Sequence, residues 1–498
     1  MKATAATIKN ITTLGALKKA GYATRGIKEE LRTNLIERLS TGQSPFPGIW
    51  GYEDTVIPEV ERAILSMHSI SFLGLRGQAK TRMARMMVQL LDEFVPIIEG
   101  SELNDDPLAP LSYFGIAKVA ELGDNTPIAW LGREDRYIEK LATPDVSVAD
   151  LIGDADPIKA ATLKLPYSDE RVIHFGLIPR SHRCIFVINE LPDLQARIQV
   201  ALFNILQEGD IQIRGFRKRL PLDIMFVFTA NPEDYTNRGS IVTPLKDRIE
   251  SQILTHYPKT IEIGKKITMQ EARLKGAQKQ DITIPTLAID LIEQVAQEAR
   301  VSEFVDAKSG VSARLTISAL ENLASAAERR MILSNEKKTH IRMSDLWGII
   351  PSITGKIELV YEGEQEGTAV VAQNLIGKAI RTLFNQYFPN PEKAKKKKGA
   401  NPYAEITTWF GDNKLQLGFD MDDTNYRTQL DRIPSLRQLV EERMPDADAK
   451  LVYFMMEFVL HGLSEYSQIS KQALTEGINF SDLVGSMFSA DFEDDDEL

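Results

Sequence analysis

The chain has 498 residues, of which 43% are hydrophobic and 26% charged, an ordinary composition for a soluble globular protein of two to four domains. Its net charge of −11 argues against a general nucleic-acid binder, although a local basic channel is compatible with it. The single cysteine, Cys184, excludes an intrachain disulfide and fits a reducing compartment. Since neither a membrane-length apolar stretch nor a signal peptide is evident, we expect a cytoplasmic protein.

The first half of the chain predicts an α/β domain. Residues 1–45 are helix-prone and end at a Pro- and Gly-rich boundary. Across 46–260, short apolar runs alternate with helical patterns, which is typical of a parallel sheet covered by helices. The strand candidates are 69–73, 137–141, 184–188 and 224–230, and a small hairpin is expected at 211–214 and 218–220.

The second half predicts helices. Residues 261–350 carry apolar residues every three or four positions, which predicts a helical lid. Residues 351–400 are expected to hold one helix and a Lys-rich connector. The last segment, 401–498, is expected to be a mostly helical accessory domain that ends in an acidic tail. The helices expected after residue 350 include 370–388, 434–443 and 449–466.

A glycine-containing loop joins the first predicted strand to a helix. The sequence FLGLRGQAKT at 72–81 leads an apolar run through two glycines to Lys80 and Thr81. Backbone N–H groups at such a turn surround a phosphate, while the lysine neutralises it and the threonine can ligate Mg²⁺. We therefore predict a P-loop, in which Ala79 stands where the GxxxxGK[ST] pattern has its second glycine. An ordinary helix start is the alternative.

A second apolar strand ends in a polar pair. The run CIFVINE at 184–190 closes on Asn189 and Glu190, where the usual pair is Asp and Glu. Asn189 can hydrogen-bond a metal-bound water but lacks the carboxylate charge that a hard cation favours. We therefore expect a weaker Mg²⁺ dependence at this position, with Glu190 as the base that orients the attacking water. A capped strand end with a solvated glutamate is the alternative.

The next strand also ends in a polar residue. Residues 191–216 predict a helix, a Gly-Asp turn and the hairpin, and the strand that follows ends in Asn231. An amide at the tip of a strand beside the P-loop strand can hydrogen-bond the terminal phosphate or the attacking water. As part of an Asn-Pro pair, Asn231 is otherwise a turn signal.

Together these segments resemble one branch of ATPases. The segments GLRGQAKT, IFVINE, LQEGDIQI, FTANPED and PLKDRI occur in the order found in the MoxR and magnesium-chelatase branch of the AAA+ ATPases. An alanine before the P-loop lysine is common in that branch. The similarity covers roughly residues 46–350. It implies an AAA+ P-loop nucleotide-binding domain with a parallel sheet, followed by an α-helical lid.

The resemblance implies two cofactors, ATP and Mg²⁺, and roles for individual residues. Thr81 and Asn189 would lie beside the Mg²⁺ ion. Arg248 matches the arginine finger that reaches the nucleotide of a neighbouring subunit, and Arg314 matches the second sensor. The catalytic residues implied are Glu190, Asn231, Arg248 and Arg314, and the nucleotide-binding residues are Ile49, Trp50, Gly51, Gly74, Gly77, Gln78, Ala79, Lys80, Thr81 and Asn189.

Two of these assignments have plainer alternatives, and so does a basic cluster near the predicted hairpin. Arg248 follows Asp247 and can form a surface ion pair with it, which contributes little. Arg314 at a predicted helix start can simply be solvated, although an anion nearby would explain a cation there. A basic cluster by the hairpin is either a solvated turn or a contact with a polypeptide in a central pore. Its residues are Arg214, Arg217, Lys218 and Arg219.

The function implied is a cytoplasmic, Mg-dependent ATPase that assembles head to tail into a ring or spiral, with a hexamer expected. Turnover would remodel or activate a partner protein, as a co-chaperone or assembly factor. The family precedent works with a von Willebrand factor A-domain protein. An ATP-switched scaffold with little hydrolysis, because of Asn189, is the first alternative. A DNA-acting motor is the second, and the acidic charge and the lack of a GAFTGA-like loop count against it.

Overall fold

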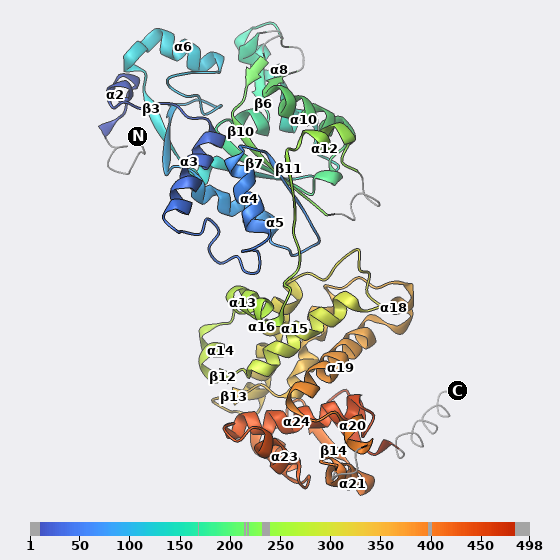
Figure 1. Cartoon of the computed structure of the whole chain (residues 1–498). Helices are drawn as coiled ribbons and strands as arrows, with labels where there is room; N and C mark the ends of the chain where they lie inside the picture. Colours follow the sequence, from blue (N-terminus) through green and yellow to red (C-terminus); the bar gives the residue numbers. More distant parts are fainter. Residues whose placement is uncertain are drawn as a thin grey trace. The chain divides into compact units, whose positions relative to one another are not determined.

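The computed structural model describes residues 10–167, 169–213, 216, 219–231, 240–396 and 401–483 (Figure 1). It divides into two compact units, Met1–Tyr257 and Pro258–Leu498. The division falls close to the point where the sequence changes from alternating strands and helices to helices alone. None of the described helices combines the length and the apolar character needed to cross a membrane.

A five-stranded parallel sheet forms the centre of the first unit. Its strands are β1 (Ile70–Leu73), β4 (Tyr137–Leu141), β7 (Cys184–Asn189), β10 (Ile224–Ala230) and β11 (Ser251–Leu254). The order across the sheet is β11-β1-β10-β7-β4, and every neighbouring pair is parallel. The four predicted strands are thus confirmed. The edge strand β11 was not predicted, because its sequence SQIL is short and alternates polar with apolar residues.

Helices cover both faces of this sheet. The helices of the first unit are α2 (Leu14–Lys19), α3 (Ile27–Ser40), α4 (Val56–Leu65), α5 (Lys80–Met86), α6 (Tyr113–Leu122), α7 (Val148–Leu151), α8 (Pro157–Leu163), α9 (Leu177–Arg180), α10 (Ala196–Glu208) and α12 (Thr243–Arg248). On β7, Ile185 and Val187 join a core with α3, α4 and α5, whereas Phe186 and Ile188 join one with α10 and α12. This alternation confirms the predicted α/β class.

Small antiparallel pairs extend the first unit. They are β2 (Phe94–Ile98) with β3 (Ile128–Gly132), β5 (Gly153–Ala155) with β6 (Ile173–Phe175), and β8 (Asp210–Gln212) with β9 (Arg219–Pro221). The last pair is the predicted hairpin; its first strand is one residue shorter than expected, and its second strand is shifted by one residue. Three residues of the predicted basic cluster, Arg214, Arg217 and Lys218, lie outside the described residues, as does the acidic tail.

The second unit is built on one continuous core. Its helices are α13 (Ile261–Glu271), α14 (Gly276–Asp281), α15 (Thr286–Val301), α16 (Arg314–Leu333), α17 (Ile350–Thr354), α18 (Tyr361–Glu366), α19 (Thr368–Tyr387), α20 (Pro391–Lys396), α21 (Ala404–Asp412), α22 (Asp423–Asp431), α23 (Leu436–Arg443) and α24 (Ala449–Glu465). Buried residues from Ile282 to Phe480 belong to the same core, so the segments expected as lid and accessory domain pack together.

Two short sheets complete the second unit. The strands β14 (Leu415–Gly418), β16 (Gly477–Ser481) and β15 (Ser470–Leu474) pair antiparallel in that order. The strands β12 (Ile282–Thr283) and β13 (Thr339–His340) pair in parallel. These strands leave no clear pattern in the sequence, because each is short and contains polar residues. The helices predicted at 370–388, 434–443 and 449–466 are present as α19, α23 and α24. Residues 351–400, expected to hold one helix and a connector, hold α18 and α20 as well as α19.

A buried carboxylate joins α24 to the 3₁₀ helix η6 (Met343–Ile349). Glu457 is fully buried, and its two oxygens accept the backbone N–H groups of Met343 and Ser344, each at 2.9 Å. The hydroxyl of Tyr426 donates to the same carboxylate at 2.7 Å. Because these donors are shielded from water, the carboxylate is the group that satisfies them.

We predict that Glu457→Gln lowers the free energy of unfolding by about 2 kcal/mol, because the new amide nitrogen would face a backbone N–H and leave a buried donor unpaired. Urea unfolding measures this loss. Glu364→Gln, which changes an exposed glutamate of α18, is the matched control and should stay within about 0.5 kcal/mol of the parent. Equal midpoints for the two variants would contradict the assignment.

Candidate nucleotide-binding site

The loop between β1 and α5 needs its glycines for two different reasons. At Gly74 the neighbours are close: a Cβ built there would lie 1.9 Å from Oγ1 of Thr255 and 2.2 Å from Oε1 of Gln78. At Gly77 the backbone has a φ of +72°, a conformation that side chains disfavour. The loop therefore turns tightly against the end of β11, with its backbone close to neighbouring side chains.

Ala79 adopts a backbone conformation that glycine usually provides. Its φ of 57° and ψ of 16° are left-handed, and it precedes the first residue of α5. An L-residue pays about 1 kcal/mol or somewhat more for this conformation. The position that departs from the P-loop sequence pattern thus keeps the backbone shape that the pattern's glycine allows.

Lys80 lies buried at the start of α5, with 7% of its surface exposed. Its ammonium donates to the carbonyl oxygen of Gly74, to that of Leu75 at 3.0 Å and to Oδ1 of Asn231 at 2.7 Å. A lysine ammonium has three N–H donors, so these contacts match its capacity. A phosphate bound in the loop would replace one of these acceptors. The other contacts would keep the ammonium within the loop.

Asn231 connects the lysine to the predicted base. Besides accepting from Lys80, it donates from Nδ2 to Oε2 of Glu190 at 3.3 Å. The residue follows β10, whose neighbours in the sheet are β1 and β7. Three of the predicted residues, two that follow strand ends and one at the start of α5, are therefore brought into one hydrogen-bonded chain.

Thr81 and Asn189 also meet, at the other side of the lysine. The Thr81 hydroxyl donates to Oδ1 of Asn189 at 3.2 Å, and the Thr229 hydroxyl donates to the same oxygen at 3.0 Å. Because the Thr81 proton is directed to Asn189, the lone pairs of its oxygen are available to a cation. Hydroxyl and amide oxygens are ligands suited to Mg²⁺ or to its bound water, so the donor set fits a magnesium-nucleotide complex.

A segment before α4 is attached to the loop by a tyrosine. The Tyr52 hydroxyl donates to the carbonyl oxygens of Gln78 and His256, both at 2.9 Å, and burial raises its pKa to about 12. Ile49, three residues earlier, is buried in the core below. The predicted adenine-contacting residues Ile49, Trp50 and Gly51 thus lie in a segment that is hydrogen-bonded to the loop, and their contact with a base stays a prediction.

Sequence reasoning missed several residues of this site. Thr229 on β10 donates to Asn189, and Thr255, just after β11, donates to Gln78 in the loop; no local pattern distinguishes either threonine. Glu139, in the middle of β4, accepts from Nδ2 of Asn189 at 2.7 Å. A charged residue in the middle of the predicted strand 137–141 is the available signal for Glu139.

Neither of the two predicted arginines is among the residues whose contacts with the loop are described above. Arg248 pairs with Asp247, donates to Gln207 at 3.4 Å and lies over the ring of Phe203 at 5.2 Å. The surface ion pair named as an alternative is therefore present. Arg314 belongs to the second unit, where it is the exposed first residue of α16. The finger and sensor roles stay predictions.

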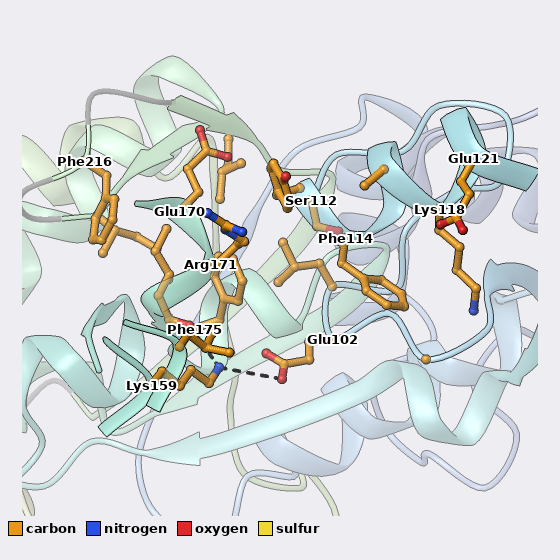
Figure 2. Close-up of a pocket in the computed structure, with 18 of the residues that line it drawn as sticks. Glu102, Ser112, Phe114, Lys118, Glu121, Lys159, Glu170, Arg171, Phe175 and Phe216 are labelled. Atoms are coloured by element: carbon orange, nitrogen blue, oxygen red, sulfur yellow. Dashed lines mark hydrogen bonds and ion pairs between the residues drawn. The ribbon is translucent and has the colours of Figure 1, made fainter. Parts of the chain in front are cut away.

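A large cavity lies elsewhere in the first unit (Figure 2). It measures about 720 Å³ and is lined mainly by apolar side chains, among them Phe114, Phe175 and Phe216. Lys159 points toward Glu102 across it, 4.0 Å away. The lining residues come from α6, α8 and the small antiparallel pairs, and the loop residues at 74–81 are not among them. The cavity is therefore distinct from the phosphate-binding loop.

The sheet order and the loop contacts define a P-loop nucleotide-binding fold in the first unit. No protein-family model matches the chain. Among solved structures, it is similar to a candidate ATPase from Cytophaga hutchinsonii, with 16% identity, a TM-score of 0.27, and coverage of 72% of this chain and 97% of that one.

Two further similar structures are complexes. One holds subunits BchI and BchD of magnesium chelatase, with 18% identity, a TM-score of 0.32, and coverage of 64% of this chain and 98% of that one. The other is Hsp104 with a nucleotide analogue and casein, with 15% identity, a TM-score of 0.37, and coverage of 70% and 55%. Because the TM-scores are low, we base the fold class on the sheet and the loop.

We predict opposite effects for two substitutions at Ala79. Ala79→Gly removes the left-handed strain and should raise the free energy of unfolding by up to about 1 kcal/mol, with nucleotide affinity unchanged. Ala79→Val places a β-branched residue at positive φ and should lower both stability and affinity. Thermal unfolding and titration with a fluorescent ATP analogue measure the two quantities. A valine variant that matches the glycine variant in both would show that the left-handed conformation is wrong.

Proposed function

We propose that this protein is an AAA+-type ATPase that hydrolyses ATP at the loop between β1 and α5. The observation that carries the proposal is the hydrogen-bonded chain from Lys80 through Asn231 to Glu190. It joins a phosphate-binding cation to a carboxylate at the carboxyl edge of one parallel sheet. No other cluster in the described residues combines these groups with a glycine loop at a helix start.

Each residue has a distinct part in this proposal. Lys80 would neutralise phosphate charge, and the loop N–H groups would surround the phosphates. Glu190 would accept a proton from the attacking water and orient it, while Asn231 holds the carboxylate relative to the lysine. Mg²⁺, when bound with ATP, would reduce the charge of the phosphates from the side of Thr81 and Asn189.

The oligomeric state and the partner rest on the resemblance. The proposed arrangement is a head-to-tail ring or spiral, a hexamer in the first instance, in which Arg248 completes the site of the neighbouring subunit. Its side chain is 37% exposed on the surface, which is compatible with reaching another chain. The proposed output is remodelling or activation of a protein partner in the cytoplasm, with a von Willebrand factor A-domain protein as the family precedent.

A nucleotide-switched scaffold is the second candidate, and a specific observation favours it. Asn189 occupies the position next to Thr81 with a neutral amide, so the site lacks a carboxylate at that point. Weak metal binding there would slow hydrolysis without preventing nucleotide binding. The two candidates differ in turnover, so phosphate release separates them.

We predict that Glu190→Gln lowers the steady-state rate of phosphate release about 10²- to 10⁴-fold, because an amide does not accept the proton. ATP binding should persist in this variant and be lost in Lys80→Ala. Glu29→Gln, an exposed position on α3, is the matched control and should turn over like the parent. A parent that binds ATP but releases phosphate no faster than Lys80→Ala would establish the scaffold instead.

For the subunit interface we predict that Arg248→Ala retains ATP binding and loses about 10³-fold or more in hydrolysis. Mixing this variant with Glu190→Gln subunits should restore part of the turnover, because each supplies the group that the other's shared site lacks. Mixed assemblies are verified with two different affinity tags. Assemblies that contain both variants and remain inactive would contradict a site shared between subunits.

A further inference from the structure

The residue that departs most from the expected chemistry, Asn189, has a carboxylate beside it. Oε1 of Glu139 accepts the hydrogen bond from Nδ2 of Asn189 at 2.7 Å. Glu139 is the middle residue of β4, which pairs in parallel with β7, and it lies opposite Val187 in that pairing. The two side chains therefore project from adjacent strands, Asn189 from the carboxyl end of β7 and Glu139 from a position two residues before Leu141, which pairs with Asn189.

This contact fixes the orientation of the Asn189 amide. An ionised carboxylate only accepts hydrogen bonds, so the amide must turn its nitrogen toward Glu139. Its oxygen is then directed to the hydroxyls of Thr81 and Thr229, which both donate to it. Asn189 is 7% exposed, so few water molecules compete for these contacts. Glu139 thus decides which atom of Asn189 faces the metal-binding threonine.

The second oxygen of Glu139 is also held. Arg85 on α5 and the hydroxyl of Tyr137 donate to Oε2 at 2.7 Å and 3.0 Å. Burial raises the pKa of Tyr137, and the charge of Glu139 raises it further. The Tyr137 hydroxyl therefore keeps its proton and remains a donor. The Arg85 side chain is 65% exposed, so solvent screens the ion pair. The Glu139 carboxylate thus lies between the neutral amide of Asn189 and the solvent-exposed guanidinium of Arg85.

We propose that Glu139 is a positioning residue for the magnesium-nucleotide complex, and that it supplies from β4 the carboxylate charge that Asn189 lacks on β7. The inference rests on the proposed ATP site. It makes Asn189 and Glu139 a two-residue equivalent of a single aspartate, with the amide oxygen toward Thr81 and the charge one hydrogen bond further out. Outer residues of this kind change metal affinity about 10- to 100-fold.

The test measures binding rather than turnover. A fluorescent ATP analogue is titrated into the full chain at a series of Mg²⁺ concentrations and in EDTA. Glu139→Gln removes the charge and lets the Asn189 amide turn, so the Mg²⁺ concentration that gives half of the metal-dependent gain in affinity should rise about tenfold or more. Affinity in EDTA should stay at the parent value. Glu134→Gln, an exposed glutamate near the start of β4, is the control and should leave both quantities unchanged.

A charge exchange distinguishes the proposed role from a structural one. The double variant Glu139→Gln with Asn189→Asp moves the carboxylate from β4 to β7 and keeps an amide in the contact. In this double variant, the Mg²⁺ concentration that gives half of the metal-dependent gain in affinity should return to within about threefold of the parent value. That difference is small beside the rise of about tenfold or more expected for Glu139→Gln alone. A purely structural role for Glu139 predicts no recovery in this double variant.

Each remaining outcome is decisive. An unchanged Mg²⁺ dependence in Glu139→Gln, or an equal loss of affinity with and without the metal, overturns the proposal and leaves the ATP site intact. A parent chain that binds no nucleotide in either condition overturns the ATP site itself, and Glu139 then has no ligand to position.

Discussion

The site depends on one constraint of the sheet, the insertion of β10 between β1 and β7. Parallel pairing on both sides sets Leu73 opposite Ala230 and Phe228 opposite Ile188, so the three strands end at the same edge. Asn231, the next residue after β10, can then reach both a lysine and a glutamate. A shift of one residue in either pairing would turn the alternating side chains of β10 to the other face and break this chain.

Two departures from the P-loop pattern are accommodated by different physical means. At Ala79 the backbone takes the left-handed conformation, and the cost is a local strain. At Asn189 the backbone is an ordinary strand end, and what is missing is a charge. In the structure a carboxylate of the adjacent strand lies against that amide. The departure at Ala79 is thus accommodated by the backbone of that residue itself. The departure at Asn189 is accommodated by a side chain from another strand.

The sequence predicts four strands of the central sheet, including the edge strand β4, but misses the other edge strand, β11. Strands β7 and β10 are buried on both faces, so each forms an uninterrupted apolar run that is easy to identify. Strand β11 and the small sheets of the second unit are short and half exposed, and they leave no such run. The P-loop residues follow from a local pattern, whereas Thr229 and Tyr52 act through contacts between distant segments. The role proposed for Arg248 requires a neighbouring subunit, and Arg314 belongs to the second unit. The fold and the sequence pattern of the first unit alone therefore do not determine the roles of these arginines.

A structure of the protein with Mg²⁺ and a slowly hydrolysed ATP analogue tests the central claim most directly. The account predicts the terminal phosphate beside the Lys80 ammonium, with the metal on the side of Thr81 and the Glu190 carboxylate facing the phosphate. A nucleotide bound in another place, such as the apolar cavity lined by Phe114 and Phe216, would contradict it.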